Sequence, residues 1–507
     1  MPGGFVTGKL ICSTSGIRGK TGSALNFSQA YKIASLFFEE YISQTLTSKK
    51  ENMHPLKIKI VLGRDARKSN DLLVSGVKKA FEDINKNEGI KIKLVYLGVS
   101  STPLLQWAIK NYKAAGGINI TASHNPIGWS GFKLYDWRGI LLGRKEMKRI
   151  ASRLTGKDTF QISNISNLNY RLPVVDSVQA YNKYVFEKVQ EAIDLVSGRK
   201  GMGKEIFEGM KFRNYRIVID ACSKDGAEIP LQFLLYLGFK KRNIFIINAG
   251  TIENSKRRLE PASQYLGNLK KAIKKLKADV GFAFDPDQDR LVVMPLRSEE
   301  HTLLLCGKFL LELQRKYNPG QYIKNIPVNL STTSAWEELA RDYRVGIIRT
   351  KIGERNVIQA MQRNNCLFGG EGNGGVILGN VIYGRNSTVG MALILAYLSW
   401  TGKKIIELEH EIPDYILAKT KLRIPSNKSP EVIMNKIFSK MKKVAKNIDK
   451  RDGLKIFFKD NSWLQLRPSG TEPVLRIFAE ARVCDTRKKT MEKIRNIIKT
   501  AIPDSWD

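Results

Sequence analysis

Ser123 is the residue whose type and position most directly indicate chemistry. It lies in the motif TASHNP, residues 121–126, directly after the apolar run 117–120, which predicts a buried strand. Pro126 and Gly128 prevent that strand from continuing. A hydroxyl on such a turn faces the cleft at the strand ends, where α/β proteins bind ligands. The alternative is an ST-turn or a helix cap, both common roles of a loop serine.

Three aspartates form a second candidate site. Asp285, Asp287 and Asp289 occur in DPDQDR, residues 285–290, after a strongly apolar predicted strand at 280–284. In extended backbone, side chains at i, i+2 and i+4 point to one side, so these carboxylates need a cation to offset their repulsion. Mg²⁺ suits three carboxylates and leaves room for a phosphate oxygen. The alternative, an acidic surface turn, is disfavoured by the apolar strand and the basic chain.

A glycine-rich loop is the third candidate. The motif GEGNGG, residues 370–375, follows an apolar run and contains Glu371 and Asn373. Glycines let the backbone approach a ligand closely, and these two side chains can hydrogen-bond the hydroxyls of a polyol. A glycine-rich turn alone is a weak signal.

The fourth candidate is a cluster of hydroxyls and guanidinium groups near the end of the chain. The motif RPSGTEP, residues 467–473, is followed by another arginine, and the cluster comprises Arg467, Ser469, Gly470, Thr471 and Arg476. Arginine binds phosphate with two parallel hydrogen bonds, and successive backbone N–H groups can cradle an anion. A hairpin turn with a capping hydroxyl is the alternative.

The elements that must position these loops alternate between strands and helices. Strands are predicted at 57–62 and 92–97, with helices at 70–84, capped by Ser69, and at 103–113. Such alternation favours βαβ units with a largely parallel sheet. The glycine-flanked loop near residues 13–19 presents Arg18, and Lys133 is close enough in sequence to Ser123 to reach the same cleft.

Two similar units and a different final unit follow a polar linker at 156–172. The second unit is predicted from 178 to 284, with strands at 215–219, 243–247 and 280–284. The third has strands at 326–328 and 345–349. The last hundred residues combine four strands with helices at 430–448 and 487–502, which indicates a small α+β domain.

Composition excludes several classes of protein. At 507 residues, with 42% hydrophobic and 26% charged residues, the chain is expected to form several globular domains. Its N-terminus has no apolar segment typical of a signal peptide, so a cytoplasmic location is expected. Five scattered cysteines and four distant histidines favour neither a disulfide framework nor a zinc site. The apolar run near 389–400 is too short to cross a bilayer.

The net charge of +36 would attract polyanions such as nucleic acid. The charge is spread along the chain, however, and residues 269–277 illustrate its pattern: apolar residues at helical spacing and lysines on the other face. Lysines on solvated helix faces are therefore the preferred explanation, and no nucleic-acid partner is expected, because no nucleic-acid-binding motif occurs.

The four loops, in this order, resemble those of the α-D-phosphohexomutase superfamily. The matching motifs are TASHNP, DPDQDR, GEGNGG and RPSGTEP, with STSGIRG (13–19) and GRDAR (63–67) in support. The resemblance implies a heart-shaped, four-domain α/β protein: three related α/β domains with mixed sheets and a C-terminal α+β domain. Their expected bounds are 1–160, 173–298, 299–408 and 412–507. A degenerate mutase serving as a scaffold is the rival, which the intact motifs disfavour.

The resemblance also implies roles for the candidate residues. Ser123 would carry a phosphoryl group, and Mg²⁺ would be held by that residue with Asp285, Asp287 and Asp289. A sugar 1,6-bisphosphate would form as the intermediate and act as activator. Charge on the transferring group would be stabilised by Arg18, His124, Lys133 and Arg290, and Arg18 and Lys133 would also handle protons. Glu371 and Asn373 would contact the sugar. The phosphate clamp would consist of Arg467, Ser469, Gly470, Thr471 and Arg476.

The glycine-rich loop that contains Glu371 and Asn373, called the sugar loop below, bears on which sugar is bound. Many members of the family end the sugar loop with Ser-Gly-His, whereas this chain has Asn373 and Gly375 at the first and last of those positions. The GEGNGG variant resembles bacterial phosphoglucosamine mutases, so glucosamine 6-phosphate is the expected substrate, with mannose or glucose phosphates as the alternative. The expected partner is thus a hexosamine or hexose monophosphate, without membrane association, and the protein would be a monomer or homodimer.

Overall fold

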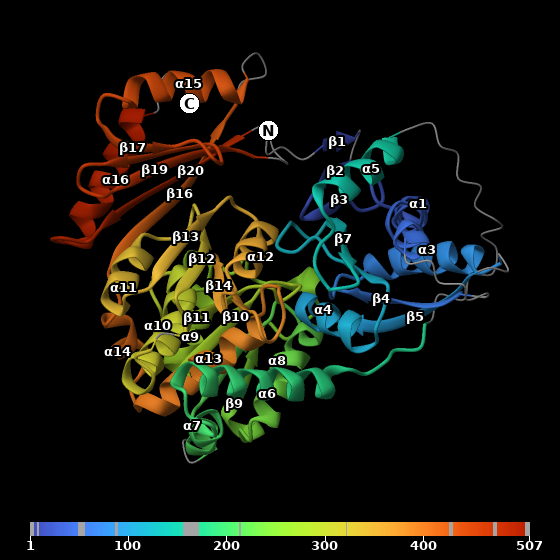
Figure 1. Cartoon of the computed structure of the whole chain (residues 1–507), viewed down its shortest axis with the longest axis horizontal. Helices are drawn as coiled ribbons and strands as arrows, with labels where there is room; N and C mark the ends of the chain where they lie inside the picture. The colour runs from blue at the N-terminus through green and yellow to red at the C-terminus, as the bar shows by residue number, and fades with distance from the viewer. Residues whose placement is uncertain are drawn as a thin grey trace.

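The chain folds into four consecutive units, each built on its own sheet (Figure 1). The computed structural model describes residues 5–7, 10–48, 56–86, 90–155, 172–211, 214–320, 322–424, 429–469 and 474–501. In Figure 1 the first unit lies to the right, the second and third share the centre, and the fourth lies at the upper left. This four-unit α/β architecture confirms the fold class expected from the sequence.

The first unit contains a seven-stranded mixed sheet in the order β1-β2-β3-β7-β6-β4-β5. Its strands are β1 (Phe5–Thr7), β2 (Leu10–Ser13), β3 (Gly16–Lys20), β4 (Leu56–Arg64), β5 (Ile90–Val99), β6 (Gly116–Ile120) and β7 (Trp129–Asp136). Its helices are α1 (Phe27–Phe37), the π-helix η1 (Phe38–Ser43), α2 (Gln44–Ser48), α3 (Asn70–Ile84), α4 (Thr102–Asn111) and α5 (Arg144–Thr155).

The second unit has the sheet order β11-β10-β8-β9. Its elements are α6 (Val178–Ser197), α7 (Met202–Lys211), β8 (Ile217–Asp220), α8 (Lys224–Tyr236), η2 (Lys241–Asn243), β9 (Ile244–Ile247), η3 (Ile252–Asn254), η4 (Ser263–Tyr265), α9 (Gly267–Lys275), β10 (Val280–Phe284) and β11 (Leu291–Met294). One buried apolar cluster joins α4 of the first unit, α6 and α7 to the helices of the third unit, so these units share a core.

The third unit has the order β13-β12-β14-β15. Its elements are α10 (Glu300–Tyr317), β12 (Asn325–Asn329), α11 (Ala335–Tyr343), β13 (Gly346–Thr350), α12 (Glu354–Arg363), β14 (Phe368–Glu371), β15 (Gly375–Leu378), α13 (Ser387–Thr401) and α14 (Ile405–His410). The apolar α13 is buried along nearly its whole length inside the protein. Of the helices that the structure describes, none combines the length and apolarity needed to cross a bilayer.

The first three units repeat one strand pattern. In each, three parallel strands in the order second-first-third are followed by an antiparallel fourth strand: β5-β4-β6-β7, β9-β8-β10-β11 and β13-β12-β14-β15. In the first sheet, however, four of the six described strand pairs are antiparallel, so the expectation of a largely parallel sheet is wrong there. The short loop 121–128 can join only antiparallel strands, because a parallel connection needs about a dozen residues or more.

The candidate loops occupy equivalent positions in these units. Each lies in the hairpin between the third and fourth strands: Ser123 between β6 and β7, the three aspartates between β10 and β11, and the GEGNGG loop between β14 and β15. Three hairpins at equivalent positions thus place a hydroxyl, a group of carboxylates and a glycine-rich loop at the carboxyl end of the third strand of each unit.

The fourth unit is an antiparallel sheet in the order β16-β20-β19-β18-β17, with its own apolar core. Its elements are β16 (Tyr415–Arg423), α15 (Pro430–Met441), β17 (Ala445–Asp449), β18 (Leu454–Phe458), β19 (Trp463–Pro468), β20 (Val474–Arg482) and α16 (Arg487–Ala501).

Two local expectations are wrong. The predicted helix 430–448 ends at Met441, and residues 445–449 instead form β17, because they pair with the free edge of β18. Such pairing depends on the rest of the sheet and cannot be read from a local pattern. Ser69 precedes α3, but its side chain makes no capping hydrogen bond.

Candidate active site

The Ser123 hydroxyl is buried where the first two units meet. Its backbone adopts a left-handed conformation with φ of 51°, and its N–H donates to Thr121 Oγ1 at 2.9 Å. Its Oγ donates to Asp285 Oδ2 at 3.1 Å. A non-glycine residue held in this conformation costs free energy, and such residues concentrate at functional sites.

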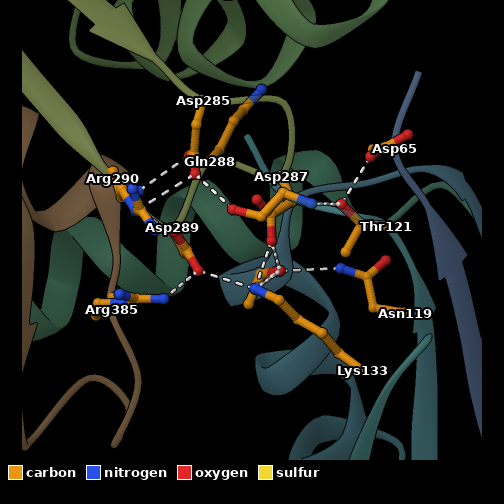
Figure 2. Close-up of polar contacts among 12 residues, drawn as sticks. Asp65, Asn119, Thr121, Lys133, Asp285, Asp287, Gln288, Asp289, Arg290 and Arg385 are labelled. Carbon is orange, nitrogen blue, oxygen red and sulfur yellow. Dashed lines mark hydrogen bonds and ion pairs between the residues drawn. The ribbon is translucent and has the colours of Figure 1, made fainter. Parts of the chain in front are cut away.

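A buried ion pair supports the loop at residues 121–126 that carries Ser123, called the serine loop below. Arg67 pairs with Asp65, and both side chains are fully buried. Arg67 Nη2 also donates to the carbonyl oxygens of Ser123 and Asn125, at 2.8 Å each. Asp65 in turn accepts from Thr121 Oγ1 at 2.6 Å (Figure 2). These positioning residues belong to GRDAR, which the sequence offered only as a supporting motif.

The three aspartates converge through a turn rather than through extended backbone. Residues 285–290 form a tight turn in which Gln288 has φ of 53°, so the expected alternation along a strand is wrong. The convergence itself is confirmed: one oxygen from each of Asp285, Asp287 and Asp289 lies within 4.8 Å of the others, and all three residues are buried (Figure 2). The turn thus brings the three carboxylates together, as the expected alternation along a strand would have done.

Cationic side chains surround the turn, yet two carboxylate oxygens accept no hydrogen bond from the residues described. Lys133 Nζ lies 2.5 Å from Asp287 Oδ2 and 2.8 Å from Asp289 Oδ2. Arg290 Nε lies 3.7 Å from Asp285 Oδ2. The Oδ1 atoms of Asp287 and Asp289 are buried without a hydrogen-bond partner in the described part of the chain. Hard oxygen ligands in this state fit Mg²⁺, which these three aspartates would hold.

The carboxylates are held in different electrostatic environments. Burial, with repulsion from Asp289 and Asp287, raises the pKa of Asp285 well above its ordinary value. Burial also raises the pKa of Asp289, but Arg385 and Lys133 outweigh it and lower that pKa well below the ordinary value. Asp287 and Asp289 likewise outweigh burial at Lys133 and raise its pKa, so the ammonium stays charged.

Two of the predicted catalytic residues, His124 and Arg18, contact the loop that carries Ser123. His124 Nδ1 lies 3.4 Å from Ser123 Oγ. Burial and the charges of Arg290 and Arg18 lower the pKa of His124 well below its ordinary value, so the ring is neutral. Arg18 extends from β3 and its Nη1 donates to Asn125 Oδ1 at 3.4 Å. A neutral imidazole thus lies beside the Ser123 hydroxyl, and a guanidinium group contacts Asn125, two residues further along the loop.

Sequence reasoning missed Arg385, which joins two of the loops. Its Nη2 lies 2.6 Å from Asp289 Oδ2 (Figure 2). Its Nη1 lies 2.7 Å from Glu371 Oε2. The same two loops also touch through the backbone, because Leu291 N donates to Gly374 O at 3.0 Å. The only sequence signal was a single arginine directly before the long apolar run of α13, in a chain rich in basic residues.

Arg385 also explains the glycine at position 375. A Cβ atom there would lie 2.4 Å from Arg385 Cδ and 3.1 Å from Asn373 Oδ1. The first distance is shorter than atoms of this kind tolerate, so a side chain at 375 and the observed arginine exclude each other.

Glu371 of the sugar loop is buried and fully engaged. Its Oε1 accepts from Asn329 Nδ2 at 2.7 Å and from Gly353 N at 3.0 Å. Asn373 is half-buried, and its Oδ1 has no hydrogen-bond partner among the residues described. Asn373 therefore offers a ligand an acceptor, whereas Glu371 is already held by three donors, including Arg385.

The phosphate-clamp arginines lie on neighbouring strands. Arg467 of β19 and Arg476 of β20 are directly opposite each other in the antiparallel register. Arg467 Nε donates to Asp452 Oδ1 at 3.0 Å. The charge of Arg476 helps to lower the pKa of His124, after burial, Arg290 and Arg18.

The remaining members of the predicted phosphate clamp are Ser469, Gly470 and Thr471. Ser469 ends the β19 side of the hairpin, and its N–H donates to Val474 O at 2.9 Å. Gly470 and Thr471 lie outside the described residues.

The fold and the site together define an enzyme of phosphoryl transfer on sugars. Family models of phosphoglucomutase/phosphomannomutase match the chain throughout: α/β/α domain I at 9–161, domain II at 203–297, domain III at 298–415 and the C-terminal domain at 426–497. The chain belongs to this family, part of the α-D-phosphohexomutase superfamily, and is a phosphohexomutase, an isomerase-type phosphotransferase.

Named relatives span several sugar specificities. A phosphoglucomutase/phosphomannomutase of Thermococcus kodakarensis is 30% identical over 495 residues, covering 96% of this chain and 97% of the relative. A phosphoglucosamine/phosphogalactosamine mutase of Sulfurisphaera tokodaii is 29% identical, covering 87% and 91%. The crystal structure of a putative phosphomannomutase from Thermus thermophilus has a TM-score of 0.70 at 20% identity, covering 97% and 100%, and shares the fold.

Proposed function

We propose that this protein interconverts glucosamine 6-phosphate and glucosamine 1-phosphate through a phosphorylated Ser123 and a sugar 1,6-bisphosphate. The observation that carries the proposal is the 3.1 Å contact between Ser123 Oγ and Asp285 inside the buried carboxylate cluster. A hydroxyl in that position can both give and receive a phosphoryl group. The same geometry supports the alternative of mannose or glucose phosphates.

Each half of the reaction moves one phosphoryl group. In the first half, the P–Oγ bond at Ser123 breaks, a P–O bond forms to the free sugar hydroxyl, and the proton of that hydroxyl is transferred in net terms to the serine oxygen. In the second half, the reoriented bisphosphate returns its other phosphate to Ser123 by the reverse step. Phosphoryl transfer depends on position and charge neutralisation, and Mg²⁺ held by Asp285, Asp287 and Asp289 would supply part of that neutralisation.

The surrounding side chains divide this work. Lys133 and Arg290 lie against the carboxylates and hold positive charge beside the transferring group. Arg18 faces the serine loop and adds to this charge. His124 is neutral and lies 3.4 Å from Ser123 Oγ, so its ring can share a hydrogen bond with the serine oxygen. Lys133 is held charged by Asp287 and Asp289 and is therefore a poor proton donor.

The preference for glucosamine rests on the sugar loop and on the names of relatives. The free Oδ1 of Asn373 suits a donor on the sugar, which an amino group provides in addition to hydroxyls. Several relatives are named phosphoglucosamine mutase, one of them from Prochlorococcus marinus. We place the enzyme in cytoplasmic amino-sugar synthesis, as a monomer or homodimer.

Turnover of glucosamine, glucose and mannose 6-phosphates, measured side by side with Mg²⁺ and a trace of the matching bisphosphate, tests the proposal. We expect the largest kcat/KM for glucosamine 6-phosphate. Ser123→Ala should abolish turnover of all three and leave the fold intact. A clear preference for mannose or glucose phosphate would select the alternative, and full activity of Ser123→Ala would overturn the mechanism.

A further inference from the structure

Asp452 joins the fourth unit to the third at a buried position. It lies in the turn between β17 and β18 and is only 2% exposed. Its Oδ1 accepts from Arg467 Nε at 3.0 Å, and its Oδ2 accepts from Ile352 N, in the third unit, at 2.7 Å. One carboxylate therefore holds an arginine of the phosphate clamp and a backbone group of the neighbouring unit.

The contact with Ile352 leads directly to the sugar loop. The next residue, Gly353, donates its N–H to Glu371 Oε1 at 3.0 Å and has φ of 117°, a conformation that favours glycine. Successive N–H groups of one short segment thus bind Asp452 on one side and Glu371 on the other. The two carboxylates therefore bind adjacent peptide units, and movement of either one would disturb the same short segment.

The turn that carries Asp452 is itself fixed in place. A Cβ atom at Gly453 would lie 2.2 Å from Leu466 O, so this turn packs tightly against β19. Two further contacts reinforce the interface: Lys455 Nζ donates to Leu330 O at 2.6 Å, and Ser331 Oγ donates to Gln465 Oε1 at 2.7 Å. The fourth unit thus rests on the loops that follow β12 and β13.

We infer that Asp452 is a positioning residue that couples the phosphate clamp to the sugar loop, through Ile352 and Gly353. The inference rests on the proposed roles of Arg467 and Glu371 in binding one substrate. When the fourth unit is docked, Asp452 orients Arg467 and fixes the segment that holds Glu371. Recognition of the phosphate and recognition of the sugar then occur together rather than independently.

The variant that tests this is Asp452→Asn in the full chain. An amide has nearly the same shape, but it presents an N–H₂ group to one of two donors that both need an acceptor. Asp460→Asn is the matched control, because Asp460 lies in the next hairpin of the same sheet and contacts only Ser462 and Lys493 of its own unit among the contacts described. Melting temperatures of both variants verify that the fold persists.

The first readout is amide hydrogen exchange without substrate. We expect exchange in peptides covering residues 351–354 and 369–375 to accelerate about 10-fold or more in Asp452→Asn, and to be unchanged in Asp460→Asn. Unchanged exchange in the sugar loop of Asp452→Asn would overturn the coupling. This readout does not need enzyme activity, so it stands or fails separately from the proposed function.

The second readout is a double-mutant cycle in kcat/KM with Glu371→Gln. We expect Asp452→Asn to lower kcat/KM about 10- to 100-fold, mainly by raising KM, and the double variant to be little worse than the poorer single variant. Additive losses would mean that Asp452 and Glu371 act independently, which would also overturn the coupling. If wild-type protein turns over no sugar phosphate while the exchange result holds, the proposed function fails and the structural coupling survives.

Discussion

Arg385 Nη2 lies 2.6 Å from Asp289 Oδ2, so an arginine that precedes α13 in the third unit offsets negative charge in the aspartate turn of the second unit. The same guanidinium reaches Glu371 of the sugar loop. Two loops that are far apart in the sequence are thus held at a fixed separation by one residue, and Glu354 Oε2 lies nearby at 3.8 Å.

Replacing Arg385 by methionine should strongly reduce activity. The substitution keeps the apolar stem but leaves the carboxylates of Asp289 and Glu371 buried without their main partner, which costs about 3–5 kcal/mol for a buried pair. We expect a loss of kcat/KM of two or more orders of magnitude, measured by steady-state kinetics. Arg385→Lys, which keeps the charge but loses the two-sided contact, should be intermediate. Wild-type kinetics in the methionine variant would contradict the linking role.

Gly375→Ala should destabilise the protein. The new methyl group would lie 2.4 Å from Arg385 Cδ, and overpacking of this kind costs about 1–3 kcal/mol. We expect a lower melting temperature and reduced kcat/KM in the same variant. Gly250→Ala serves as the control, since nothing lies within 4 Å of a Cβ atom there. Equal melting temperatures for the two variants would show that the arginine can move aside.

Stability should depend on pH through Glu300. Burial raises the pKa of Glu300 to about 7, although Lys419 and the Thr333 N–H oppose the shift while Glu299 and Glu480 add to it. The folded state therefore keeps a proton that the unfolded state loses above about pH 4.5, and the free energy of unfolding falls as pH rises from there to about 7. The loss from this group is up to about 3 kcal/mol.

Glu300→Gln isolates that contribution. Glutamine does not titrate and can still accept from Thr333 N, which donates to Glu300 Oε2 at 3.0 Å. We expect the melting temperature of the variant, relative to wild type, to rise between pH 5 and pH 8. Parallel pH profiles for the two proteins would show that Glu300 does not carry the effect.

Removal of divalent cations should abolish turnover reversibly. The Oδ1 atoms of Asp287 and Asp289 accept no hydrogen bond from the described residues, although Arg290 Nε approaches the second of them to 3.6 Å. They are the oxygens that would bind Mg²⁺, because Lys133 contacts both Oδ2 atoms. We expect activity to disappear with a chelator and return with Mg²⁺. Added Mg²⁺ should also raise the melting temperature of wild type, as any ligand of the folded state does, but not that of Asp289→Asn. A chelator-resistant enzyme would rule out the metal's role.

The sequence by itself determined the α/β units, the serine loop and the aspartate motif. These features are local: an apolar strand followed by Ser123, or by Asp285, Asp287 and Asp289, identifies a functional loop wherever the strand lies. Even the wrong premise of extended backbone at the aspartates did not matter, because closely spaced carboxylates also converge in a turn. The presence of functional residues was thus readable without their geometry.

Only the tertiary structure decided which side chains complete the site. Arg385 and Asp452 belong to no motif in a chain with 84 basic and 48 acidic residues, and nothing in their spacing distinguishes them. Their roles arise because folding removes water and leaves each beside a particular opposite charge, Asp289 or Arg467. Strand β17 also depends on tertiary structure, because residues 445–449 pair with the edge of β18. Partner choice over long sequence distances is a property of packing, and local sequence does not encode it.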